Sequence, residues 1–98
     1  MKPNFNIAFA FQQGDIDVAG EREAVLRKAI SDLVRSCRKR GFMTQEQLAY
    51  RSGISYEHLN RVENYKAMPS IEVLDRIARS LGFDSISEFL RADESSIL

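Results

Sequence analysis

The side chains of this chain that could do chemistry are suited to hydrogen bonding rather than to catalysis. Four of them lie close together: Tyr56, Glu57, Asn60 and Arg61. Steps of one, three and four residues place these four on one face of a helix, away from the apolar Leu59 and Val62. The pattern predicts an exposed polar face on a short helix.

The sequence shows no set of catalytic groups. It has no Gly-rich phosphate loop, no paired carboxylates in a defined context, and no nucleophile–base set. His58 is the only histidine and Cys37 the only cysteine, so neither an intrachain disulfide nor a cysteine-based metal cluster can form. We therefore expect no enzymatic activity, no cofactor and no metal site.

Positive charge is concentrated in the middle of the chain. The 14 basic and 14 acidic residues give a net charge of zero. The sum is −2 through Leu26, +5 from Arg27 to Met68, and −3 from Pro69 onward. A basic segment is commonly just a solvated face, but this distribution also favours contact with nucleic acid.

Helical periodicity begins at Glu21. The apolar residues recur at three- and four-residue steps: Val25, Leu26, Ala29, Ile30, Leu33, Val34 and Cys37. Three basic residues close this helix, and Gly41 is expected to terminate it. Four shorter helices follow, each with a start signal: the capping boxes Thr44–Gln47 and Ser85–Glu88, the cap Ser55, and the pair Pro69–Ser70. The sequence thus predicts an N-terminal extension over 1–20, an all-α domain over 21–92 and a tail over 93–98.

Two of these short helices are separated by only three residues. The small Ala49 lets them approach closely, and Gly53 can adopt a turn conformation that other residues resist. Apolar residues fall where the two helices must pack: Leu48, Ile54, Leu59 and Val62. The arrangement predicts a helix-turn-helix motif whose second helix, from about Ser55 to Asn64, can enter the DNA major groove.

The segment from about Ile30 to Leu90 resembles the Cro/repressor (XRE-type) helix-turn-helix family. The shared motifs are Thr44-Gln45-x-x-Leu48-Ala49, Gly53-Ile54-Ser55, Val62-Glu63-Asn64, Pro69-Ser70, Leu74, Ile77-Ala78 and Leu81-Gly82, after the basic residues that end the first helix. The resemblance implies an all-α, five-helix lambda-repressor-like domain. It also implies a homodimer that binds double-stranded DNA at a two-fold symmetric operator.

The resemblance implies that one set of residues contacts DNA phosphates and another contacts the bases. The position of Gln45 commonly binds a phosphate, and backbone amides around Asn64 to Lys66 bind another. With Arg51 added, the expected phosphate-binding residues are Gln45, Arg51, Asn64 and Lys66. The expected base-reading residues are Tyr56, Glu57, Asn60 and Arg61. Arg61 suits guanine, Asn60 adenine and Glu57 cytosine, whereas Tyr56 suits a phosphate or a thymine methyl group.

Two features distinguish the end of the helix from about Ser55 to Asn64, the recognition helix of the motif. Arg38 and Glu63 align with a structural ion pair of the family. Tyr65 stands where many members have the glycine that ends this helix in a left-handed conformation. Either Asn64 takes that conformation, which asparagine tolerates, or Tyr65 is strained or differently shaped.

The N-terminal extension carries a strictly alternating apolar stripe. Its members are Phe5, Ile7, Phe9 and Phe11, which would share one face of a strand. A single strand needs a partner. The partner is the same strand of a second subunit, a different protein such as a toxin, or the chain's own helices.

The leading functional hypothesis is a sequence-specific transcriptional regulator, most simply a repressor that binds a palindromic operator as a homodimer. The alternative is an antitoxin-like protein that binds a toxin and regulates its own operon. No apolar run approaches the roughly 20 residues of a membrane helix, and the single cysteine suits a reducing compartment. We therefore expect a cytoplasmic protein without membrane contact.

Overall fold

The computed structural model describes residues 19–92, which form five helices and no strand. They are α2 (Ala19–Arg40), α3 (Gln45–Ser52), α4 (Tyr56–Glu63), α5 (Ile71–Ser80) and α6 (Ile86–Arg91). The predicted all-α, five-helix class is therefore confirmed over this range. The predicted strand with Phe5, Ile7, Phe9 and Phe11 lies outside the described residues, as does the tail over 93–98.

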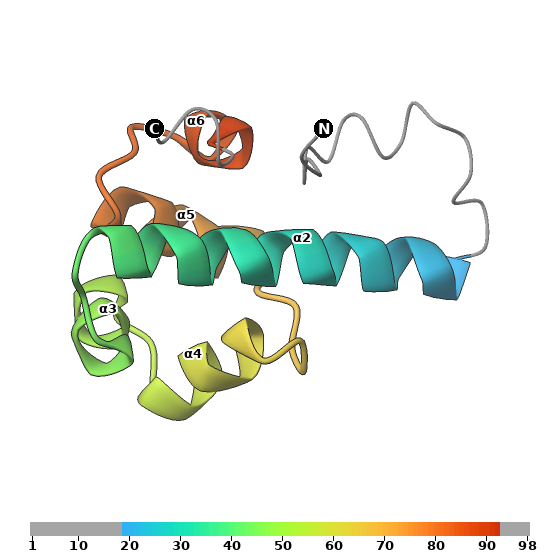
Figure 1. The fold of residues 1–98 in the computed structure, drawn as a ribbon, viewed down its shortest axis with the longest axis horizontal. Helices are drawn as coiled ribbons and strands as arrows, with labels where there is room; N and C mark the ends of the chain where they lie inside the picture. Colours follow the sequence, from blue (N-terminus) through green and yellow to red (C-terminus); the bar gives the residue numbers. More distant parts are fainter. Residues whose placement is uncertain (1–18, 93–98) are drawn as a thin grey trace.

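The long helix α2 lies at the centre of the arrangement. In the view of Figure 1, α3 and α4 lie on one side of it, and α6 lies on the other. Helix α3 packs against both α4 and α5, α4 also packs against α2, and α5 packs against α6. Within residues 19–92, no helix is both long enough and apolar enough to cross a membrane.

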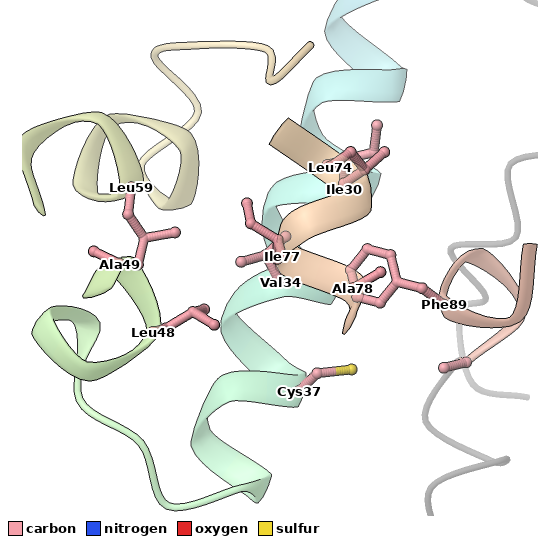
Figure 2. Close-up of a cluster of buried hydrophobic side chains, with 11 residues drawn as sticks. Ile30, Val34, Cys37, Leu48, Ala49, Leu59, Leu74, Ile77, Ala78 and Phe89 are labelled. Atoms are coloured by element: carbon pink, nitrogen blue, oxygen red, sulfur yellow. The ribbon is translucent and has the colours of Figure 1, made fainter. Parts of the chain in front are cut away.

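Every helix contributes to one apolar core, part of which is drawn in Figure 2. Its members are Ile30, Val34, Cys37, Leu48, Ala49, Leu59, Leu74, Ile77, Ala78, Phe89 and Ala92. Leu48 and Leu59 are completely buried, and Ala49 is 2% exposed. Because these residues come from the predicted helix-turn-helix pair, the same core that stabilises the domain fixes the angle between α3 and α4.

The serine and threonine start signals act as N-caps. Thr44 and Gln47 form the full reciprocal capping box of α3, and Ser55 accepts a hydrogen bond from the backbone N–H of His58. The predicted box at α6 is only half formed. Ser85 accepts from the N–H of Glu88, but the Glu88 carboxylate accepts from the N–H of Asp84, at 3.4 Å, rather than from Ser85.

Helix α2 ends where the sequence predicts, directly before Gly41. The helix ends at Arg40, but the residue with left-handed backbone is Phe42 (φ 58°) and not Gly41. The N–H of Phe42 donates to the Lys39 carbonyl and that of Met43 donates to the Arg38 carbonyl, which is the paired hydrogen-bond pattern of a helix ending at a left-handed residue. The Phe42 side chain is 93% exposed.

Gly53→Ala is expected to lower the free energy of unfolding by roughly 1–2 kcal/mol, because Gly53 ends α3 with φ 71° and a Cβ disfavours that conformation. Crowding is not the cause, since the added Cβ would lie 3.6 Å from Arg76 Nη1, an ordinary contact. Urea unfolding measures the loss. Gly20→Ala is the matched control, because it places a methyl group in open space on α2 and should not destabilise.

Candidate nucleic-acid interface

Helix α4 presents one polar face and buries the other. Tyr56, Glu57 and Arg61 are exposed, whereas Leu59 and Val62 are completely buried against the core. The helix therefore has the orientation that its sequence pattern predicts. Its bounds, Tyr56–Glu63 with Ser55 as N-cap and Asn64 as C-cap, match the predicted range.

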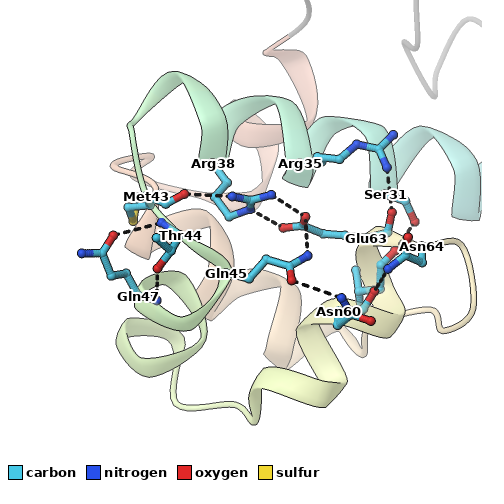
Figure 3. A network of polar contacts seen from close by, with 11 residues as sticks. Ser31, Arg35, Arg38, Met43, Thr44, Gln45, Gln47, Asn60, Glu63 and Asn64 are labelled. Atoms are coloured by element: carbon cyan, nitrogen blue, oxygen red, sulfur yellow. Dashed lines mark hydrogen bonds and ion pairs between the residues drawn. The ribbon is translucent and has the colours of Figure 1, made fainter.

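A buried carboxylate joins three helices beneath this face (Figure 3). Arg38 of α2 donates to both oxygens of Glu63, from Nε to Oε2 at 2.7 Å and from Nη2 to Oε1 at 2.9 Å. Gln45 of α3 donates from Nε2 to the same Oε1 at 2.9 Å. Glu63 is 1% exposed, so its charge depends on these partners for the hydrogen bonds that water would otherwise supply.

The network continues from Glu63 toward the polar face. Gln45 Oε1 accepts a hydrogen bond of 3.1 Å from Asn60 Nδ2, so the side-chain amides of α3 and α4 are joined directly. Asn60 is consequently half-buried and directed toward α3, unlike the exposed Tyr56 and Arg61. Gln45 and Asn60 hold the two helices of the motif together, a role that the sequence reasoning did not anticipate.

The exit of α4 resolves the question about Tyr65. Tyr65 has the left-handed backbone (φ 65°), whereas Asn64 does not (φ −104°), so the alternative in which Asn64 takes the turn is wrong. The N–H groups of Asn64, Tyr65 and Lys66 donate to carbonyls of α4, at Asn60, Val62 and Arg61. These three amides therefore already have acceptors at the helix end, and the expectation that amides here bind a phosphate stays a prediction.

Three charged residues of α2 contact the side chain of Tyr65, a residue that is 39% exposed. The Tyr65 hydroxyl donates to Asp32 Oδ1 and accepts from Arg35 Nη2 at 2.7 Å. Lys28 Nζ and Arg35 Cζ lie 5.5 and 5.4 Å from the centre of the Tyr65 ring. Sequence reasoning missed this cluster. The spacing of Lys28, Asp32 and Arg35 at three and four residues on one helix face was a usable signal, but nothing in the sequence linked them to Tyr65.

The protonation of this cluster favours its charged forms. Burial by itself would raise the pKa of Asp32, but hydrogen bonds from Lys28 and Tyr65, with the nearby positive charges, outweigh it and lower this pKa below 3.8. The hydrogen bond to Asp32 raises the pKa of Lys28. Both shifts indicate that the folded protein stabilises the carboxylate and the ammonium together.

The contribution of Asp32 to stability is expected to disappear in acid. Because its pKa is lower in the folded than in the unfolded chain, the stabilisation is fully present above about pH 4 and is lost as the pH falls through the folded-state pKa. The difference in unfolding free energy between the wild type and Asp32→Asn should therefore shrink from pH 6 to pH 3, as measured by urea unfolding. A constant difference would contradict this assignment. Asp75→Asn, at an exposed pair with Arg79, is the control.

The remaining cationic candidates occupy different places around α4. Arg61 is exposed, and its Nη2 lies 3.3 Å from the Lys66 carbonyl, a long contact that a competing partner can replace. Lys66 is exposed just beyond the α4 exit. Arg51 is exposed in the last turn of α3, whereas Gln45 begins that helix.

With a short helix held across a second one and its polar face exposed, the domain has the form of a helix-turn-helix protein. A helix-turn-helix family model matches residues 34–87, more than half of the chain and all of α3, α4 and α5. The chain therefore belongs to this family, which confirms the resemblance drawn from its motifs and places it among DNA-binding regulators.

Relatives with similar sequences carry consistent names. A protein of Methanothermobacter thermautotrophicus, named an uncharacterized HTH-type transcriptional regulator, is 37% identical over 62 residues, which cover 63% of this chain and 90% of that protein. Regulators of the same description from two Mycobacterium tuberculosis strains are 37% identical over 59 residues, 60% of this chain. The chain spans only 42% of the length of these mycobacterial proteins. No solved structure matches the chain significantly.

Proposed function

We propose that this chain is a sequence-specific transcriptional repressor that binds a palindromic operator as a homodimer. The observation that carries the proposal is the exposed face of α4 with Tyr56, Glu57 and Arg61, on a helix whose opposite face is completely buried. A helix supported in this way can enter the major groove as a unit. Bound over a promoter, such a dimer represses by excluding the polymerase.

In this proposal the base contacts come chiefly from Arg61 and Tyr56. Arg61 forms a bidentate pair with guanine, for which it gives up its long contact to the Lys66 carbonyl. Glu57 accepts from cytosine. Asn60 contributes less than its residue type suggests, because Gln45 already accepts a hydrogen bond from its amide.

Phosphate contacts supply most of the remaining affinity. Gln45 lies in the first turn of α3, where backbone N–H groups lack partners within the helix and attract an anion. Beyond the other end of the recognition helix, Asn64 and Lys66 are exposed and can contact a second phosphate through their side chains. Arg51 adds long-range attraction. The net charge of +5 between Arg27 and Met68 supports a salt-dependent interaction.

Selection of bound sequences from a random duplex pool tests the proposal most directly. We expect an enriched half-site that occurs twice in inverted orientation, with centres separated by about one helical turn of DNA or a multiple of it. Sedimentation of the free protein and of the protein–DNA complex gives the stoichiometry. Recovery of no enriched sequence would overturn the proposal, and enrichment of a single unrepeated half-site would overturn its dimeric part.

Arg61→Ala is expected to weaken binding to the selected operator about 5- to 150-fold, the equivalent of about 1–3 kcal/mol for one bidentate base contact. Binding to random duplex should change much less. Fluorescence anisotropy on the two duplexes at one salt concentration measures both affinities. Arg79→Ala is the matched control, because it removes an exposed arginine from α5, away from the recognition helix. Equal weakening on both duplexes would assign Arg61 to the DNA backbone.

A further inference from the structure

We propose that Tyr65 is a positioning residue that locks the exit of the recognition helix onto α2 and thereby sets its sequence selectivity. The inference rests on the proposed function, since selectivity requires an operator. It concerns a residue that touches no base in the proposal above. The backbone conformation of Tyr65 is unfavourable, because its φ is 65° although tyrosine carries a Cβ.

The surroundings of Tyr65 explain why this conformation persists. Its hydroxyl bridges Asp32 and Arg35, and its ring faces the cationic groups of Lys28 and Arg35. Asp32 in turn forms ion pairs of 2.8 Å with both Lys28 and Arg35. A glycine would adopt the backbone more easily but would make none of these contacts. Tyr65 therefore has an unfavourable backbone conformation, but its side chain connects the exit of α4 to α2.

The same stretch of α2 also holds the last carbonyl groups of α4 (Figure 3). Ser31 Oγ donates to the Val62 carbonyl, and Arg35 Nη1 donates to the Glu63 carbonyl at 3.0 Å. Arg35 thus contacts the helix end with one nitrogen and Tyr65 with the other. Because Tyr65 fixes Arg35 and Asp32, it acts on the end of α4 as well as on its own loop.

The residues next to Tyr65 are among those that the proposed function places on DNA. Asn64 and Lys66 flank Tyr65, and Arg61 lies one turn before it. The N–H groups of Tyr65 and Lys66, which donate to Val62 and Arg61, hold this exit against the helix. If Tyr65 releases α2, the exit of α4 shifts, and the distance between the base contacts on the helix and the phosphate contacts at Asn64 and Lys66 changes. The affinity for the operator then falls more than the affinity for random DNA.

Phe42 provides a control within the same chain. It also has a left-handed backbone (φ 58°) at a helix exit and is aromatic, but its side chain is 93% exposed. Phe42→Gly and Tyr65→Gly remove similar backbone strain, but only the second removes a connection between helices. Tyr65→Phe removes the hydroxyl alone and keeps the ring. These three variants of the full chain separate strain from positioning.

The experiment combines amide hydrogen exchange with DNA affinity. In Tyr65→Phe and Tyr65→Gly, we expect the amides of Tyr65 or its replacement and of Lys66 to exchange about tenfold faster, the size expected for losing a hydrogen bond to a charged group. The ratio of operator to random-duplex affinity should fall about tenfold, while random-duplex affinity and its salt slope stay constant. Phe42→Gly should raise the melting temperature and leave exchange at 65–66 and the affinity ratio unchanged.

Each result decides the positioning role. Unchanged exchange at positions 65 and 66 in both Tyr65 variants would overturn it. So would a Tyr65→Gly protein that keeps the affinity ratio of the wild type. If the wild type itself prefers no duplex, the proposed function fails, and with it the selectivity role; the exchange data then still decide whether Tyr65 fixes the exit of α4.

Discussion

Glu63→Ala is expected to lower the free energy of unfolding by about 3–5 kcal/mol, because it leaves the guanidinium of Arg38 without its partner in a largely buried place. Arg38 is 11% exposed in its side chain, and the substitution also takes the acceptor from the Gln45 amide. Against a total stability of about 5–15 kcal/mol for a domain of this kind, the loss is large. Urea unfolding monitored by circular dichroism measures it.

Two further variants show whether burial is the reason. Glu72→Ala removes a carboxylate from the exposed pair with Arg76, whose side chains are 76% and 47% exposed, and should cost no more than about 1 kcal/mol. Replacing Arg38 and Glu63 together by methionine and leucine should recover most of the stability, since apolar side chains can fill the site without unpaired charge. An equal cost for Glu63→Ala and Glu72→Ala would contradict the assignment.

Leu59→Ala is expected to lower the free energy of unfolding by about 2–5 kcal/mol. Leu59 is completely buried and extends from α4 toward Ala49 of α3 (Figure 2), so the truncation leaves a cavity where the two helices of the motif meet. Because Leu59 sits directly behind the polar face, we also expect operator affinity to fall at temperatures where the variant remains folded.

The matched control for this cavity is Ile71→Ala. Ile71 is 74% exposed at the start of α5, so a similar loss of apolar volume there should change the unfolding free energy by less than about 0.5 kcal/mol. Thermal and urea unfolding of both variants provide the comparison. A cost below about 1 kcal/mol for Leu59→Ala would mean that the α3–α4 junction repacks freely, contrary to the dense core described here.

Features governed by local chemistry were predictable from the sequence. Ser55 caps α4 because its hydroxyl reaches an N–H three residues on, and Gly53 takes a left-handed turn because glycine has no Cβ. The buried Leu59 and Val62 follow from helical periodicity, which also predicted the exposed Tyr56 and Arg61. Such features depend on neighbours within about one turn, so the residue order contains the information.

Features that depend on distant partners were not predictable in this way. A left-handed Tyr65 was one of two alternatives from the sequence, but the contacts of its side chain with Asp32 and Arg35 span 33 and 30 residues. The half-buried state of Asn60 depends on Gln45, 15 residues earlier. At the end of α2, Gly41 correctly predicted where the helix stops, but no residue type signals that Phe42 takes the left-handed backbone.

The carboxylate of Glu63, shared between Arg38 and Gln45, has a consequence for how the protein adapts to different binding sites. One side chain ties α4 to both α2 and α3, so the recognition helix cannot tilt by itself without breaking buried hydrogen bonds. When the recognition helix cannot change its angle, the DNA must deform to fit the protein. We therefore expect affinity differences among operators with identical contacted bases to follow the bending and twisting energy of the intervening base pairs, which the protein never touches.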